Sequence, residues 1–231
     1  MNFISFSVFG ADPMYLTGMI RNAQLAKEVY PGWKVICWCD SGLPADFMQA
    51  LAKLRVDVRE PEPKIANQMF WRFLVADEPE MERFIVRDSD SRLGAREKAA
   101  VDEWIESDLP FHVMSDHPHH WMPIGGGLWG AKAGAVNRMK KRIIGSKMAY
   151  KRYTRSEGFN QDQMFLQKYI YPLVQGKILR HDSCNRHLYP WARPFPSGCC
   201  FGDNRFVGEA FDADDKPNPW HWQQRINWMT R

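Results

Sequence analysis

The sequence predicts a single domain of the α/β class, with a mostly parallel central sheet flanked by helices. Two observations lead to this prediction. Over residues 1–92, short apolar segments typical of buried strands alternate with segments whose apolar residues have helical spacing. In addition, the apolar segment at residues 84–86 is followed by two closely spaced carboxylates, and open α/β sheets bind ligands at the ends of such strands.

The elements of the first half follow in order. Residues 3–9 predict the first strand, and Gly10 permits a tight turn or a close approach of the backbone to a ligand. Asp12-Pro13 predicts the start of a helix and Pro31-Gly32 its end. The remaining elements expected here are strands at 34–39, 56–59 and 84–86 and helices at 44–54 and 65–76.

The second half continues the pattern less regularly. The elements expected here are helices at 96–107, 138–142 and 161–171 and strands at 111–114 and 177–180. From residue 189 onward the chain is rich in Pro, Gly and Trp and shows little periodicity, so we expect an ordered but irregular C-terminal region. The length of 231 residues suits one domain over 1–231.

Composition argues against several classes of protein. The net charge of +4 favours an anionic small ligand but is too weak and too scattered for nucleic acid. No apolar run is long enough for a transmembrane segment, and the N-terminus lacks the features of a signal peptide, so we expect a cytoplasmic location. The five cysteines indicate reduced thiols, with Cys37 and Cys39 in the core. A zinc site that adds Cys199 and Cys200 is the weaker alternative.

The two carboxylates after residues 84–86 are Asp88 and Asp90. On extended backbone, positions i and i+2 point to the same face, so both can converge on one ligand. Carboxylates this close repel each other unless a cation lies between them, and hard divalent cations prefer oxygen ligands. The functional interpretation is a metal site that holds a phosphate-bearing substrate. The alternative is a solvated acidic turn paired with Arg87 and Arg92.

A glycine-rich segment and a histidine-rich segment lie further along the chain. Gly125, Gly127 and Gly130 match the spacing of a dinucleotide-binding motif but lie in mid-chain, so a backbone surface close to a substrate is the better interpretation. The segment that begins at Asp116 contains His117, His119 and His120 and predicts either an ordinary surface loop or a loop that faces the substrate.

Two more residues carry alternatives. His181 follows a predicted strand and is either a metal ligand or a structural histidine. Asp162 lies at a predicted helix start, where it either compensates the helix dipole or serves as a general base. Several of the ten tryptophans fall in loop-like contexts, which weakly favours a carbohydrate ligand.

Taken together, these features resemble the nucleotide-sugar-dependent glycosyltransferases of the GT-A fold, whose sheet is Rossmann-like. The resemblance covers most of the chain to about Asp182. More narrowly, the chain is similar to the small GT-A domain found in a chlorovirus glycosyltransferase and in related bacterial proteins. The features that carry the resemblance are Phe9-Gly10 after the first strand, Asp88-Ser89-Asp90 after an apolar strand, the Gly125–Gly130 segment, Asn160-Gln161-Asp162-Gln163 at a helix start and His181 after a late strand.

The resemblance implies a metal-dependent transferase. It would move a sugar from a nucleotide diphosphate sugar, with a UDP-sugar favoured, to a hydroxyl of a glycan or glycoconjugate acceptor. Mn²⁺ or Mg²⁺ would be bound by Asp88, Asp90 and His181, and would stabilise the leaving diphosphate. Residues 1–92 would form the nucleotide-binding half, and residues 93–231 the acceptor half and the C-terminal tail.

The resemblance also implies roles for further residues. Asp162, or else Asp116, would deprotonate the acceptor hydroxyl if the enzyme inverts. The residues expected around the donor are Gly10, Asp40, Asp57 and Asp88, with Arg72 and Arg92 offsetting phosphate charge. The alternative functions are a metal-dependent phosphohydrolase, whose paired aspartates usually follow the first strand, and a non-catalytic carbohydrate-binding protein.

Overall fold

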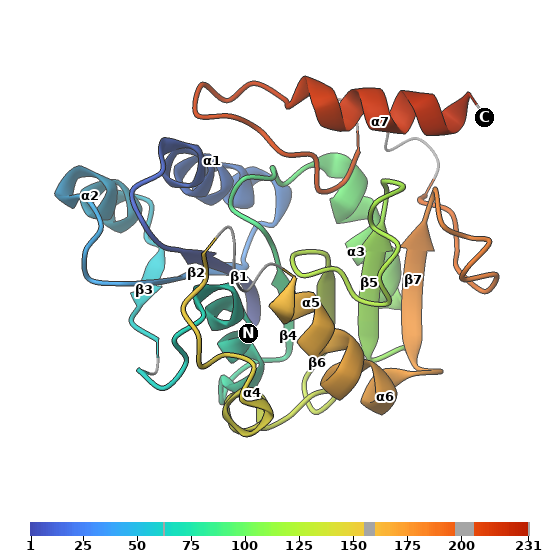
Figure 1. Ribbon diagram of the computed structural model, residues 1–231, viewed down its shortest axis with the longest axis horizontal. Helices are drawn as coiled ribbons and strands as arrows, with labels where there is room; N and C mark the ends of the chain where they lie inside the picture. Colours follow the sequence, from blue (N-terminus) through green and yellow to red (C-terminus); the bar gives the residue numbers. More distant parts are fainter. Residues whose placement is uncertain (62, 155–159, 197–205, 231) are drawn as a thin grey trace.

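The protein forms a seven-stranded sheet with helices on both faces, seen in a computed structural model that describes residues 1–61, 63–154, 160–196 and 206–230 (Figure 1). The strand order is β3-β2-β1-β4-β6-β5-β7. All described neighbours pair in parallel except those of β6, which runs antiparallel to both β4 and β5. The strands are β1 (Asn2–Val8), β2 (Lys34–Cys39), β3 (Asp57–Arg59), β4 (Arg83–Val86), β5 (Phe111–Ser115), β6 (Trp129–Lys132) and β7 (Ile178–Asp182).

Helices separate most of the strands. They are α1 (Pro13–Val29), α2 (Ala45–Lys53), the 3-10 helix η1 (Gln68–Asp77), α3 (Ala95–Glu106), α4 (Met139–Ser146), α5 (Gln161–Phe165), the π-helix η2 (Leu166–Ile170), α6 (Tyr171–Val174) and α7 (Pro219–Met229). The mostly parallel α/β fold predicted from the sequence is therefore confirmed.

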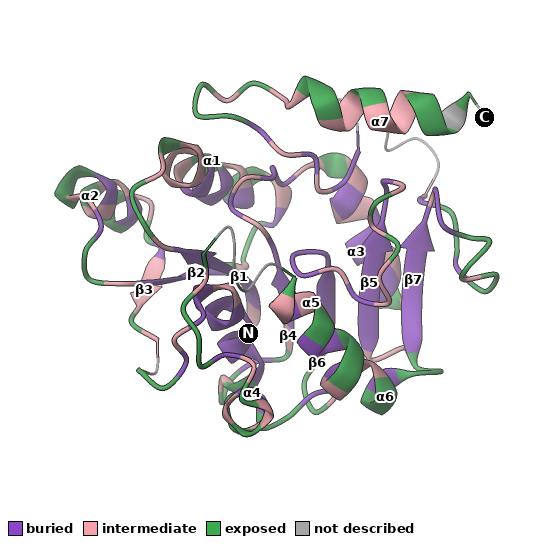
Figure 2. Ribbon diagram, in the orientation of Figure 1, coloured by how far each residue is buried: buried purple, intermediate pink, exposed green. Residues whose placement is uncertain are grey.

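The sheet separates two hydrophobic cores. Residues Ile4, Phe6 and Val8 of β1 point to the face covered by α1, α2 and α3. The other face packs against η1, α4 and α5. Strands buried on both faces lose contact with water along their length, and Figure 2 shows β1, β4, β5 and β7 buried throughout their centres.

Several features that the sequence predicts are present in the structure. Asp12 is the N-cap of α1, where its Oδ1 accepts a hydrogen bond of 3.0 Å from the backbone N of Met14, and Pro13 occupies the first turn. Cys37 and Cys39 are buried free thiols in the core, as predicted. Cys199 and Cys200 lie outside the described residues.

Three elements differ from the predictions. The helix expected at 65–76 is the 3-10 helix η1, which is buried on nearly all sides, so packing rather than one apolar stripe sets its geometry. The glycine-rich segment leads into β6, a strand that the sequence did not predict. Residues 219–229, expected to be irregular, form α7. Within the described residues, no helix has the length and apolar character needed to span a bilayer.

Candidate functional site

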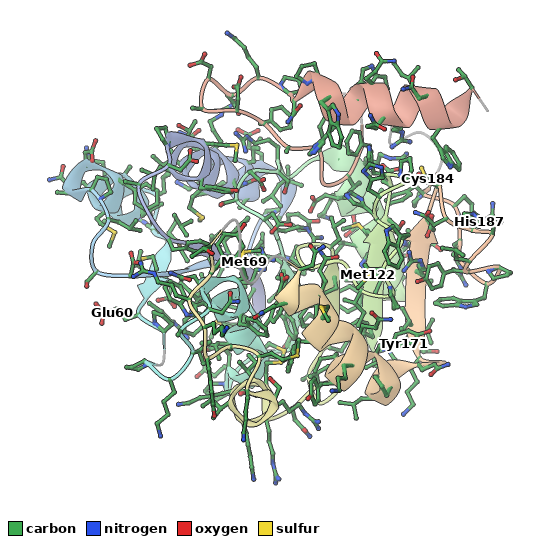
Figure 3. All side chains as sticks on the ribbon, in the orientation of Figure 1. Glu60, Met69, Met122, Tyr171, Cys184 and His187 are labelled. Atoms are coloured by element: carbon green, nitrogen blue, oxygen red, sulfur yellow. The ribbon has the colours of Figure 1, made fainter. Side chains whose placement is uncertain are left out.

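The carboxyl ends of β1, β4 and β5 meet at one edge of the sheet, because these strands run in the same direction. A pocket of about 710 Å³ opens at this edge. Met69 of η1 and Met122 of the loop after β5, both labelled in Figure 3, line it from two sides. The chain thus places its pocket where open α/β sheets bind ligands.

The loop that carries Asp88 and Asp90 lines the pocket and is held rigidly from behind. Buried Asn22 of α1 donates hydrogen bonds to the carbonyls of Ser89 (3.2 Å) and Ser91 (2.7 Å). Gly18 of α1 lies so close that a Cβ there would meet the Ser89 carbonyl oxygen at 2.0 Å. The absence of a side chain at position 18 therefore allows the loop with Asp88 and Asp90 to pack against α1.

Arg72 connects the two acidic parts of the pocket. Its Nη1 donates to Asp88, and its Nη2 donates to Oδ2 of Asp162 at 2.8 Å. The side chains of Arg72 and Asp162 are only 4% and 2% exposed, whereas Asp88 is 39% exposed. Asp88 therefore faces the open part of the pocket, while Asp162 is set deeper beside the guanidinium.

The glycine-rich segment before β6 packs directly on these carboxylates. A Cβ on Gly126 would lie 2.6 Å from Asp162 Oδ2, and one on Gly127 would lie 2.0 Å from Asp88 Oδ2. Real Cβ atoms do not approach other atoms this closely. Gly127 requires glycine because its Cβ would also lie 2.7 Å from the Asp88 backbone N, and a Cβ on Gly126 would displace the Arg72–Asp162 pair. The segment is the close backbone surface expected from the sequence, and the atoms it approaches belong to the acidic residues.

Asp90 differs electrostatically from Asp88. Burial, followed by the negative charge of Asp88, raises the pKa of Asp90 to about 7. Among the described residues, Arg72 is paired with Asp88 and Asp162, but no basic side chain forms an ion pair with Asp90. Burial and the negative charges of Asp90 and Asp88 also raise the pKa of Tyr15. The pocket therefore contains negative charge that a cation would offset.

Three histidines complete the opposite wall. His119 and His120 come from the loop after β5, and His221 comes from α7. Burial, helped by the neighbouring His117, lowers the pKa of His120 to about 3, and burial lowers the pKa of His221 as well. His120 is therefore neutral near pH 7. The histidine-rich loop therefore faces this pocket at His119 and His120.

The structure places His181 away from this pocket. It lies in β7, buried, with Nδ1 2.9 Å from Nε2 of His112 and Nε2 3.1 Å from Oε2 of Glu103. Because a carboxylate only accepts, Nε2 of neutral His181 donates to Glu103, and Nδ1 accepts from His112. Neither nitrogen is directed to the pocket that contains Asp88 and Asp90.

Asp116 also lies outside the residues that line the pocket. It is buried between Arg96 (2.6 Å) and Arg225 (3.0 Å), and it accepts a hydrogen bond from Ser183 Oγ (2.5 Å). These partners more than offset the effect of burial and lower its pKa. The residue joins α3, the end of β7 and α7, which is a structural arrangement.

Of the residues expected around the sugar donor, some line the pocket and others do not. Arg72 and Asp88 line the pocket, as do Phe9 and Asp12 on either side of Gly10. The predicted Gly10 is exposed at φ +71° and is not itself in the lining.

Three other predicted donor residues make contacts outside the pocket. Asp40 lies 3.8 Å from Arg152, and Asp57 pairs with Arg59 at 2.7 Å. Arg92 donates to Asp215 at 2.7 Å and to the carbonyls of Ser89 and Ser91, so it supports the acidic loop from outside the lining.

Some pocket residues were not predicted. Asp12, noted only as a helix cap, and Tyr15 line the pocket because α1 starts beside it. His221 does so because Asn218 caps α7 at this point: its side chain accepts from the backbone N of Trp220 at 3.0 Å, and Pro219 is the first residue of the helix. Asn218-Pro219 is the same signal as Asp12-Pro13, so the sequence contained the information needed to find this helix.

The side chains in the pocket supply some, but not all, of the ligands that a hard divalent cation needs. Asp88 and Asp90 supply carboxylate oxygens, and Asp90 has no ionic partner among the described residues. The described part of the chain holds no group of three or more His, Cys, Asp or Glu side chains arranged to bind a metal. The protein would therefore supply one or two ligands and leave the others to substrate and water, which is usual for Mg²⁺.

Comparison with solved structures identifies the architecture. Glucosyl-3-phosphoglycerate synthase from Mycobacterium tuberculosis is similar over 78% of this chain and 68% of its own, with a TM-score of 0.51 and 10% identity. The fold is GT-A. A glycosyltransferase involved in the glycosylation of the major capsid of PBCV-1 is also similar, over 78% of this chain and 81% of its own, at 16% identity and a TM-score of 0.49. No protein-family model and no curated protein matches the sequence.

Proposed function

We propose that the protein transfers a sugar from a nucleotide diphosphate sugar to a hydroxyl of a glycan or glycoconjugate acceptor. The observation that carries the proposal is the position of Asp88 and Asp90. They follow β4 at the carboxyl edge of a GT-A sheet and face a pocket of about 710 Å³ in which Asp90 has no cationic partner among the described residues. The GT-A fold does not favour the phosphohydrolase or the carbohydrate-binding alternative.

The donor would occupy the side of the pocket formed by β1, α1 and the acidic loop. Phe9 and Tyr153 meet edge to face there, with ring centroids 5.7 Å apart, and provide an aromatic wall for a nucleobase such as uracil. Asp88 and Asp90 would hold Mn²⁺ or Mg²⁺. When bound, the metal would offset the negative charge on the departing diphosphate. Arg72, held by two carboxylates, keeps Asp88 in place.

The acceptor would occupy the side formed by α5 and the loop after β5. Burial raises the pKa of Asp162, which makes its carboxylate a stronger base for an acceptor hydroxyl. Asp162 lines the pocket, whereas Asp116 is held by two arginines outside it, so we favour Asp162 as the base of an inverting reaction. The half-exposed Trp121 also lines the pocket and provides an aromatic face for the C–H surface of a sugar.

Calorimetric titration with UDP, with and without Mn²⁺, tests the proposal. We expect binding that requires the metal, that is lost in Asp90→Asn and that is retained in Asp108→Asn. Asp108 is an exposed residue that precedes β5 at the other edge of the sheet, so it is a matched control. If UDP does not bind, GDP and dTDP follow. Binding of none of the three, or binding that is independent of both Mn²⁺ and Asp90, contradicts the proposal.

A further inference from the structure

A second hollow lies at the opposite edge of the sheet. It has a volume of about 880 Å³ and lies between the end of η1 and the segment from β6 through α4. The edge is opposite because β4 starts here, where Arg83 pairs with Lys132 at the end of β6. Its apolar lining comes from residues that include Ala76, Pro79, Met81, Val136 and Ile144.

Cations are concentrated beside this hollow. Residues 138–147, which form α4 and its two ends, contain five Lys and Arg and neither Asp nor Glu. The formal net charge of the whole chain is only +4, so the rest of the chain is net negative. Arg138, Lys140 and Lys141 line the hollow itself and are exposed. In Figure 3, long side chains with nitrogen at their tips extend from this end of the molecule.

These cations lie at the N-terminus of α4, where positive charge stabilises a helix least. Arg138 is the N-cap, and Lys140 and Lys141 lie in the first turn, where the helix dipole favours anions. Asp77 offsets this by accepting hydrogen bonds of 2.8 Å from the backbone N atoms of Met139 and Lys140. Helix stability does not explain the placement of Arg138 and Lys141, and an external anionic partner is the better explanation.

The apolar and cationic groups form one continuous surface. Met139 and Ile143 anchor α4 in the core, Ile144 is half-buried and lines the hollow, and Arg138, Lys140 and Lys141 line its α4 side. The two acidic lining residues have partners inside the protein: Asp77 accepts from the backbone of α4, and Glu78 pairs with Arg59. Nucleic acid or a soluble polyanion would leave the apolar hollow in contact with water. A bilayer satisfies both parts, because its acyl boundary covers apolar groups while its anionic headgroups pair with Lys and Arg.

We propose that the face formed by α4, the hollow beside it and the cations of residues 138–147 binds the surface of an anionic membrane. The pocket with Asp88 and Asp90 lies at the other edge of the sheet, so binding by α4 leaves that pocket uncovered. The proposal does not depend on the proposed function, because it concerns different residues and a different ligand.

Co-sedimentation with vesicles tests the proposal. We expect the full chain to bind vesicles of phosphatidylcholine mixed with phosphatidylglycerol, to bind pure phosphatidylcholine weakly, and to lose affinity as salt increases. The triple variant Arg138→Glu, Lys141→Glu, Lys147→Glu should bind about a hundredfold more weakly, since each cation near an anionic surface contributes about 1 kcal/mol. Glu at position 141 suits a helix N-terminus, so this change does not act against folding.

A matched triple variant controls for net charge. Lys27→Glu, Lys53→Glu and Lys216→Glu change three exposed cations elsewhere and should bind vesicles as the unmodified chain does. Ile144→Ser, which keeps every charge, should weaken vesicle binding as well. The proposal is overturned if the unmodified chain does not bind anionic vesicles, if both triple variants lose binding equally, or if the α4 variant still binds. UDP titration of the same variants tests the first pocket separately, so a failure of the membrane proposal can be told apart from a failure of the proposed function.

Discussion

Arg72 and Asp162 form a buried ion pair across 90 positions of the chain, with Nη2 2.8 Å from Oδ2. The pair fixes the start of α5 against η1 and sets the depth of the pocket. Burying two charges is costly, and the cost is recovered only while both remain in contact.

Removing the cation from this pair should destabilise the protein strongly. Arg72→Ala leaves Asp162 buried without its partner, so we expect a loss of about 3–5 kcal/mol in the free energy of unfolding, measured by urea denaturation. Arg193→Ala is the control, because Arg193 is 57% exposed in its pair with Glu103 and should cost no more than about 1 kcal/mol. Equal effects of the two variants would contradict this account of Arg72.

Gly127 should not tolerate a methyl group. In Gly127→Ala the new Cβ would meet Asp88 Oδ2 at 2.0 Å and the Asp88 backbone N at 2.7 Å, and a backbone atom cannot move aside as a flexible side chain can. We expect a loss of about 1–3 kcal/mol in stability together with weaker nucleotide binding. Gly125→Ala is matched to it, since that Cβ would contact Leu128 at an ordinary 3.5 Å. Thermal unfolding of both variants checks the prediction, which fails if they behave alike.

The stability of the protein should depend on Asp116 at neutral pH and less so in acid. Burial alone would raise its pKa, but Arg96 and Arg225 lower it below the unfolded value of about 3.9. The ionised form therefore stabilises the fold fully above that value, and this contribution is lost as pH falls through the folded pKa. We expect Asp116→Asn to be destabilised at pH 7 and the difference from the unmodified chain to shrink below about pH 3.9. A difference that is constant with pH in urea denaturation would contradict this.

Arg225 should hold α7 over the first pocket. Its guanidinium lies 3.0 Å from Asp116 Oδ1 and over the ring of Phe206, 5.5 Å from the centroid. We expect Arg225→Ala to increase hydrogen exchange of the α7 amides by at least about tenfold, because a hydrogen bond to a charged group contributes about 1.5–3 kcal/mol. Gln223→Ala removes only an exposed hydrogen bond to Asn227 within the same helix and should change exchange much less. Unaltered exchange in the Arg225 variant would show that other contacts hold α7.

The elements that could be predicted are those with a local cause. The cap formed by Asp12, the strand before Asp88 and the terminating Pro31-Gly32 each act over a few neighbouring residues, and the structure has a helix or strand boundary near each of them. The strand β6 could not be found this way. A Cβ at Gly130 of β6 would lie 2.6 Å from the carbonyl oxygen of Phe84 in β4, so the neighbouring strand requires glycine at this position. Within the sequence, however, glycine weakens the pattern typical of a strand.

Within the candidate site, the same distinction applies. Asp88 and Asp90 were predicted because two carboxylates two positions apart after an apolar strand form a local pattern, although the backbone at 89–90 is a turn and not extended as expected. The partnership of Arg72 with Asp162 depends on the packing of η1 against α5 and cannot be read from spacing. His181 follows a strand as expected, but its side chain is directed to Glu103 and His112 by contacts with α3 and β5, which the sequence does not reveal.

The antiparallel direction of β6 has a consequence for how the pocket could change. Because β6 enters the sheet at the edge where β5 leaves it, residues 116–128 form a closed excursion whose two ends are fixed by the pairing of Val113 with Trp129. This excursion carries His119, His120, Trp121 and Gly126 to the pocket. The part of the excursion between Asp116 and Gly126 can therefore vary in length and composition while the strands keep their register, so ligand preference could change without a change in the sheet.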